Sequence, residues 1–183
     1  MIKNNKKGFT IIEVVLVLAI AGLIFLMVFI ALPALQRSQR NTQRRQDMSR
    51  FVSAITTYAS NNKGKLPFEG AQSNGAPTSY DDENTEWVKK YIMAGNVEEF
   101  QDPDGTYYAF TRAYTGAAAY NNNQADLSSS ITTSTYANHH VVVAVPGHSC
   151  GDGEGRVQKA SGDRFFALFM VLEGGSITCA DNQ

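Results

Sequence analysis

One uninterrupted apolar run near the N-terminus constrains this chain more than any other feature. Residues 9–35 read FTIIEVVLVLAIAGLIFLMVFIALPAL and contain a single charged residue, Glu13. A helix of about 20 apolar residues is long enough to cross the hydrocarbon layer of a membrane. The chain has 183 residues, which leaves enough sequence for one compact domain beside such a helix. The sequence therefore predicts a membrane-spanning helix followed by one globular head.

Other interpretations of the run explain it less well. A secretory signal peptide has an apolar core of about 7–15 residues and a small-residue site after it, whereas this run is longer and lacks that site. A head of this size could not enclose the whole run as a buried core helix. An ordinary single-pass anchor fits the length but does not explain Glu13. Because a lone ionisable group in a membrane costs at least about 2.5 kcal/mol, Glu13 is a candidate functional residue.

The charges of the chain are segregated, although the net charge is only −1. Residues 1–8 carry +3 and residues 36–50 carry +4, whereas residues 51–183 carry 15 acidic and 8 basic side chains. The lysines before the apolar run predict a cytoplasmic N-terminus, although the arginines after it are unusual for an exported flank. The uniform basic coat of a protein that binds nucleic acid non-specifically is absent, so nucleic acid is not indicated as a partner.

The residues around the start of the apolar run resemble a known signal. Residues 6–13, KKGFTIIE, are similar to the class III signal of type IV pilins, of the type IVa-like kind, and of related pseudopilins. The resemblance implies that a prepilin peptidase cuts between Gly8 and Phe9 and N-methylates Phe9, and that Glu13 is the glutamate of the family. The stretches LPALQRSQRNTQRRQDMSRF and LEGGSITCADN resemble pilins from ultrasmall candidate-phyla bacteria.

Physical chemistry agrees with an assembly role for Glu13. A cut before Phe9 leaves a membrane anchor whose free amine is cationic near neutral pH. Glu13 lies one helical turn from that amine, so in a bundle of such helices it can neutralise the amine of a neighbour. Because a buried ion pair fixes register better than it stabilises, Glu13 is predicted to set the axial stagger.

The helix is predicted to continue from Thr10 to about Asn61. Apolar residues recur beyond the membrane segment at steps of three and four: Met48, Phe51, Val52, Ile55, Tyr58 and Ala59. Gly64 and the proline after it predict the end of the helix. Gly22 and Pro33 are candidate hinges, with a kink expected near residues 29–33, because proline removes a backbone hydrogen bond and clashes with the preceding turn.

Five arginines follow the apolar run: Arg37, Arg40, Arg44, Arg45 and Arg50. They could meet lipid phosphates beneath the membrane surface. They could also contact the acidic heads of adjacent subunits, for example at residues 81–83. Both interpretations stay open on the sequence alone.

The head is predicted to be α+β, with an antiparallel sheet packed against the apolar stripe of the helix, as in the type IV pilin fold. A loop is expected at 66–82, a short helix around Trp87–Ile92 and a polar surface stretch at 115–135. The expected strands are 106–114, 141–145, 165–172 and 176–180. The predicted organisation is a leader at 1–8, a membrane and filament-core half-helix at 9–35, an amphipathic half-helix at 36–62 and a head at 63–183.

Two cysteines, Cys150 and Cys179, lie in the C-terminal fifth. An even count in an exported chain predicts one disulfide, and a C-terminal disulfide is also what the resemblance implies. Closing this loop stabilises the head by about 3–4 kcal/mol in the chain-entropy model. Two unpaired core thiols are the alternative.

Several motifs suggest chemistry but lack the context it needs. GHSCG at residues 147–151 fits the G-x-S-x-G elbow, but the following glycines disfavour the helix that a hydrolase requires. The histidines at 139, 140 and 148 match no zinc spacing. Asp102 with Asp104, or Asp152 with Glu154, could bind calcium. No catalytic residue, cofactor or metal is predicted.

The sequence thus predicts a structural subunit. The precursor would span the cytoplasmic membrane once, contact lipids there, and be polymerised by a separate ATPase and platform protein into an extracellular homo-oligomeric filament for adhesion, twitching motility or DNA uptake. A pseudopilin of a type II secretion-like system and a membrane-anchored binding protein are the alternatives.

Overall fold

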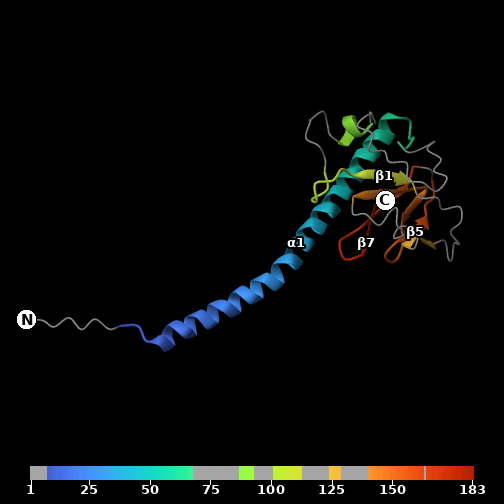
Figure 1. The fold of residues 1–183 in the computed structure, drawn as a ribbon. Coiled ribbons are helices and arrows are strands. Elements are labelled where there is room, and N and C mark those ends of the chain that lie inside the picture. The colour runs from blue at the N-terminus through green and yellow to red at the C-terminus, as the bar shows by residue number, and fades with distance from the viewer. Residues whose placement is uncertain (1–7, 68–86, 93–100, 113–123, 129–139, 163) are drawn as a thin grey trace, which may run out of the picture. The chain divides into compact units, whose positions relative to one another are not determined.

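The computed structural model describes residues 8–67, 87–92, 101–112, 124–128, 140–162 and 164–183 (Figure 1). The chain divides into two compact units, residues 1–39 and residues 40–183. One long helix, α1 (Ile11–Asn61), begins in the first unit and ends in the second. The strands all belong to the second unit, so the predicted α+β class with a long N-terminal helix is confirmed.

The helix begins one residue later than predicted and ends where the sequence places its end. It stays helical through Gly22 and Pro33. At the C-terminal end, the Gly64 N–H donates to the Ala59 carbonyl oxygen at 2.7 Å. Lys63 and Gly64 have positive φ angles of 58° and 84°. A left-handed cap of this kind satisfies the last carbonyl groups of a helix, which stops α1.

A four-stranded sheet forms the middle of the second unit. Its order is β1 (Ala109–Arg112), β3 (Val141–Pro146), β6 (Phe166–Val171) and β7 (Ile177–Asp181). The β3–β6 and β6–β7 pairs are antiparallel, as predicted, whereas β1 pairs with β3 in parallel. The expectation of a wholly antiparallel sheet was wrong at this edge. A parallel pair needs a long crossover connection, and the long stretch between β1 and β3 supplies one.

A second, three-stranded sheet was missed. Its order is β2 (Gln124–Asp126), β5 (Arg156–Lys159) and β4 (His148–Cys150). The prediction of a surface stretch at 115–135 was therefore wrong for the residues around β2, because Ala125 and Leu127 are buried. Their spacing of two residues turns both side chains to the same face of the strand.

The two sheets and the helix form three layers within the second unit. Alternate residues of β3 and β6, such as Val142 and Leu168, pack with Phe51 and Ile55 of α1. The intervening residues, such as Val143, pack with the second sheet. Both faces of the central strands are thus buried, which explains their almost continuous apolar sequences.

A five-residue π-helical segment, η1 (Val88–Ile92), stands where a short helix was predicted. Trp87, just before it, is buried. The Tyr58 ring of α1 lies 5.3 Å from the Tyr91 ring in an edge-on arrangement. Edge-to-face aromatic pairs of this kind add to the burial of the rings, so η1 packs on the last turns of α1.

Candidate processing and assembly site

The residues that precede α1 are accessible. Gly8, Phe9 and Thr10 are non-helical and exposed, and the Phe9 side chain is 91% exposed. The peptide bond between Gly8 and Phe9, predicted as the cleavage site, therefore lies in an open, non-helical segment just before the helix. The leader before Gly8 lies outside the described residues.

Thr10 and Glu13 together cap the start of α1. The Thr10 N–H donates to Glu13 Oε2 at 2.9 Å, and the Thr10 hydroxyl donates to the same oxygen at 2.8 Å. The sequence-based prediction gave Thr10 no role, although Thr-x-x-Glu is the spacing of a capping box. In this chain the Glu13 carboxylate thus has local hydrogen-bond donors.

Gly8 and Gly22 were predicted to be a cleavage residue and a hinge. Contacts within this chain do not require glycine at either position. A Cβ atom built on Gly8 or on Gly22 would meet nothing within 4 Å, and neither residue has a positive φ angle. Glycine in a helix interior costs about 1 kcal/mol relative to alanine. Neither glycine is therefore explained by backbone strain or by crowding in the described residues.

The apolar surface of α1 in the first unit is uncovered. Its most apolar window of 18 residues has a mean hydropathy of 3.2, and none of that window is buried. Among the described residues, α1 is the helix that is long and apolar enough to cross a membrane. Side chains such as Leu23, Phe25 and Ile30 are all more than half exposed. Such a surface needs lipid or other helices around it.

The sequence model of the prokaryotic N-terminal methylation motif matches residues 3–29. This match supports a type IV pilin-like prepilin. The matched residues include the predicted cleavage site, Glu13 and most of the apolar run. The searches of curated proteins and of solved structures found no match.

The motif implies how the chain is processed and where it is placed in the cell, in coarse terms. A class III signal implies processing by a prepilin peptidase and entry into pilus or secretion-type assembly. Together with the apolar helix found among the described residues, the motif supports a membrane-anchored precursor that is assembled into a filament. Pilin-like families are structural rather than catalytic.

Two arginines of α1, Arg40 and Arg44, bind the head of the same chain. We call five residues the Arg44 cluster: Arg40, Asn41, Arg44, Asp102 and Glu173. Arg44 donates two hydrogen bonds of 2.6 Å to the two carboxylate oxygens of Asp102, and both side chains are fully buried. Arg44 also donates to Glu173 at 2.7 Å, and Arg40 donates to both Glu173 oxygens at 2.6 and 2.7 Å.

The rest of the cluster fixes the backbone of Glu173. The Asn41 amide donates to the Glu173 carbonyl oxygen and accepts from its N–H, each at 3.0 Å. The hydrogen bond from Arg40 is the largest cause that lowers the pKa of Glu173, to about 2; partial burial opposes it, and the hydrogen bond from Arg44 adds to the lowering. Arg40 and Arg44 therefore hold α1 to the turn between β6 and β7.

The Arg44 cluster also bears on the calcium hypothesis. The Asp102 carboxylate is occupied by a guanidinium group, so a calcium ion at Asp102 and Asp104 would have to displace Arg44. Among the described residues, no group of three or more His, Cys, Asp or Glu side chains could hold a metal ion. The alternative acidic pair, Asp152 and Glu154, is exposed in the turn between β4 and β5.

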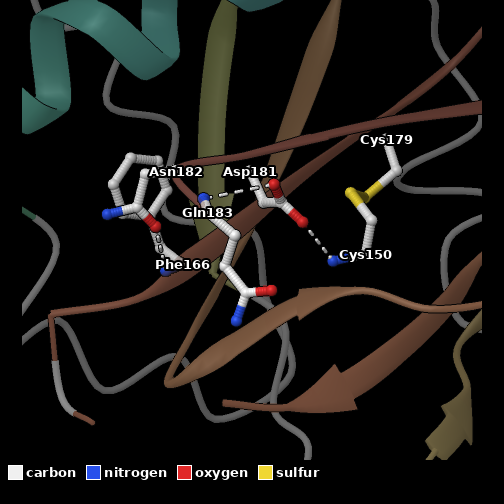
Figure 2. Close-up of a disulfide and its surroundings, with 6 residues drawn as sticks. All are labelled: Cys150, Phe166, Cys179, Asp181, Asn182 and Gln183. Carbon is white, nitrogen blue, oxygen red and sulfur yellow. Dashed lines mark hydrogen bonds between the residues drawn. A yellow bond between two sulfur atoms is a disulfide. The ribbon is translucent and has the colours of Figure 1, made fainter. Parts of the chain in front are cut away.

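The predicted disulfide is present. Cys150 of β4 and Cys179 of β7 are bonded, with their Cα atoms 6.0 Å apart. Figure 2 shows that the Cys150 N–H donates to Asp181, at 2.7 Å, beside this bond. The Asn182 side chain accepts from the Phe166 N–H at 3.0 Å. The disulfide therefore joins the two sheets, and the C-terminal residues are held against β4 and β6.

The GHSCG motif at residues 147–151 does not have the geometry of a hydrolase nucleophile elbow. His148, Ser149 and Cys150 form strand β4, and the chain then turns into β5 rather than into a helix. Ser149 is buried, whereas a nucleophile elbow exposes its serine. His148 Nδ1 lies 2.7 Å from the Pro146 carbonyl oxygen. Of the other two histidines, His139 lies outside the described residues.

Proposed function

We propose that this prepilin is the structural subunit of a type IV pilus and not an enzyme. A prepilin peptidase cuts between Gly8 and Phe9 and N-methylates Phe9, and an assembly ATPase with its platform protein draws the mature subunit from the membrane into a helical surface filament. Adhesion, twitching motility and DNA uptake are the uses that such a filament would serve. The observation that carries the proposal is the uncovered apolar helix that starts directly after an open cleavage segment.

The surroundings of Gly8 support recognition by an enzyme. A peptidase needs an extended, accessible backbone, and Gly8 and Phe9 are non-helical and exposed. The space around Gly8 would accept a side chain within this chain. A requirement for glycine there would consequently come from the peptidase, whose cleft must approach the backbone closely.

Glu13 supports the assembly step. In the precursor its carboxylate accepts two hydrogen bonds from Thr10, which reduces the cost of holding a polar group near the apolar helix. After the cut, the cationic amine of Phe9 lies within one helical turn of Glu13. In a bundle, the carboxylate pairs with the amine of a neighbouring subunit and so sets the axial register, while the apolar side chains provide the adhesion.

The proposed division of the chain follows this sequence of events. The leader at 1–8 is removed, the half-helix at 9–35 moves from lipid into the filament core, and the half-helix at 36–62 carries the head at 63–183. Gly22 and Pro33 are the proposed hinges. A proline inside a helix leaves one carbonyl without its usual donor, which lowers the cost of local bending during this transfer.

The experiment is electron microscopy of surface filaments on cells with and without the gene, using an antibody to the head. We expect labelled filaments that disappear on deletion and return on complementation. Loss of protein secretion with the filaments unchanged would instead assign the chain to a pseudopilin of a type II secretion-like system. An unprocessed chain without any fibre would leave a membrane-anchored binding protein.

A further inference from the structure

Arg44 stands at a position of α1 where an apolar side chain would continue the buried stripe. The buried residues of α1 recur at steps of three and four, and Arg44 precedes Met48, Phe51 and Ile55 in that series. These three apolar residues are at most 1% exposed, and Arg44 is buried to the same degree. A buried ion pair loses the hydration of both charges, so it is weak evidence for stability. Stability alone therefore does not explain a guanidinium at this position.

The Arg44 cluster joins three segments of the second unit. Asp102 lies in a turn before β1, which is closed by the Gly105 N–H donating to the Asp102 carbonyl oxygen at 2.8 Å. Glu173 lies in the turn between β6 and β7. Arg44 donates to Asp102 through Nε and Nη2 and to Glu173 through Nη1. One side chain of α1 is thus bonded to both turns.

These contacts are directional, whereas the apolar stripe is not. Apolar burial depends on area rather than on direction, and packed helices can move past a neighbour by one turn, about 5.4 Å. The guanidinium of Arg44 meets both carboxylate oxygens of Asp102 at 2.6 Å, a two-pronged geometry that fits in one orientation. Asn41 adds two bonds of 3.0 Å to the backbone of Glu173. The cluster therefore restricts both sliding and rotation of α1 against the two turns.

We propose that the Arg44 cluster is a positioning element for assembly: it fixes the axial position and the rotation of α1 against the head, and polymerisation requires this single arrangement. The inference rests on the proposed function, because a fixed head matters where identical subunits repeat the same contacts along a filament. Arg44 and Asp102 act as positioning residues. A buried polar residue that sets the register of a coiled coil, at some cost in stability, works by the same principle.

The test separates positioning from stability in the full-length chain. Arg44→Met with Asp102→Asn, called the uncharged variant, removes both charges of the pair so that neither stays buried alone. Ile55→Val and Ile55→Ala are the matched controls, because they lower stability by increasing amounts in the apolar core of the same helix without removing a directional contact. Together with the wild type, they give the relation between melting temperature and the yield of sedimentable fibre.

The uncharged variant should fold and form the Cys150–Cys179 disulfide, but its fibre yield should lie about tenfold or more below that relation. Arg44→Lys keeps the positive charge but loses the two-pronged geometry, so it should also fall below the relation. The start of the mature chain is measured in every variant, which detects a processing defect separately.

A fibre yield of the uncharged variant that follows the relation overturns the proposal. Failure of this variant to fold overturns it as well, because the cluster would then be needed for folding rather than for positioning. Absence of fibre from the wild type would refute the proposed function instead.

A second measurement needs no fibre. Spin labels at Gln46→Cys on α1 and Gln158→Cys on β5, both exposed positions, report the distance between the helix and the outer sheet in pulsed electron paramagnetic resonance. The full chain in detergent should give one narrow distance, and so should Ile55→Ala. The uncharged variant should give a broader distribution or a second distance, as expected when α1 moves by up to one turn, about 5.4 Å. A narrow, unchanged distance in the uncharged variant contradicts the positioning role.

Discussion

Replacing Arg44 by methionine tests how the helix is held to the head. Methionine keeps much of the side chain's volume but removes the guanidinium. Glu173 would keep both hydrogen bonds from Arg40. Of its donors among the described residues, Asp102 would keep the Asp104 N–H, at 3.0 Å, and would lose both guanidinium hydrogen bonds while fully buried. The loss of stability should therefore come mainly from Asp102, whose buried negative charge no longer has a cationic partner.

The expected cost follows from that uncompensated charge. Removing one partner of a buried ion pair costs about 3–5 kcal/mol. For a unit of this size, each kcal/mol shifts the melting temperature by about 3 °C. The Arg44→Met variant should thus melt about 10–15 °C below the wild type. Adding Asp102→Asn removes the buried charge, so the double variant should be more stable than Arg44→Met alone.

The assay is thermal unfolding of the full chain in detergent, followed by near-ultraviolet circular dichroism, which reports the aromatic residues of the head. Arg45→Met is the matched control, because Arg45 is exposed on the same helix. Exposed substitutions of this kind usually change stability by less than about 0.5 kcal/mol. A melting temperature for Arg44→Met within about 2 °C of this control would refute the reasoning.

Three further outcomes are expected. Glu173 has a folded-state pKa of about 2 against an ordinary 4.5, so its ionised form stabilises the fold above pH 4.5, and this contribution is lost as the pH falls towards 2. Glu173→Gln should therefore flatten this part of the curve of unfolding free energy against pH. An unchanged curve would contradict the ion pair. Reduction of Cys150–Cys179 should lower the melting temperature by about 10 °C, and no shift would mean that the bond does not stabilise the head. Glu13→Val should leave cleavage intact in mass spectra but abolish fibres, and wild-type fibre from it would exclude a register role.

The elements with local signals could be predicted from the sequence. The cap at Gly64 and the long apolar pattern placed α1 almost to the residue. The apolar runs that became β3 and β6 were placed within one residue at each end, because strands buried on both faces have little polar alternation. The two cysteines were correctly paired, since only one intrachain pairing exists for two.

The elements that depend on distant partners could not be predicted in this way. Strands β4 and β5 are short and partly polar, so neither shows a clear alternation. The parallel pairing of β1 depends on how the chain returns to β3, which no local pattern encodes. Arg44 looked like the other arginines because its partners lie 58 and 129 residues away.

The intact mass of the native protein, taken from cells with their own processing machinery, tests the central claim most directly. The account predicts a chain that begins at Phe9, carries one added methyl group and retains the Cys150–Cys179 disulfide. A chain that still begins at Met1 in assembled or surface-exposed protein would contradict it.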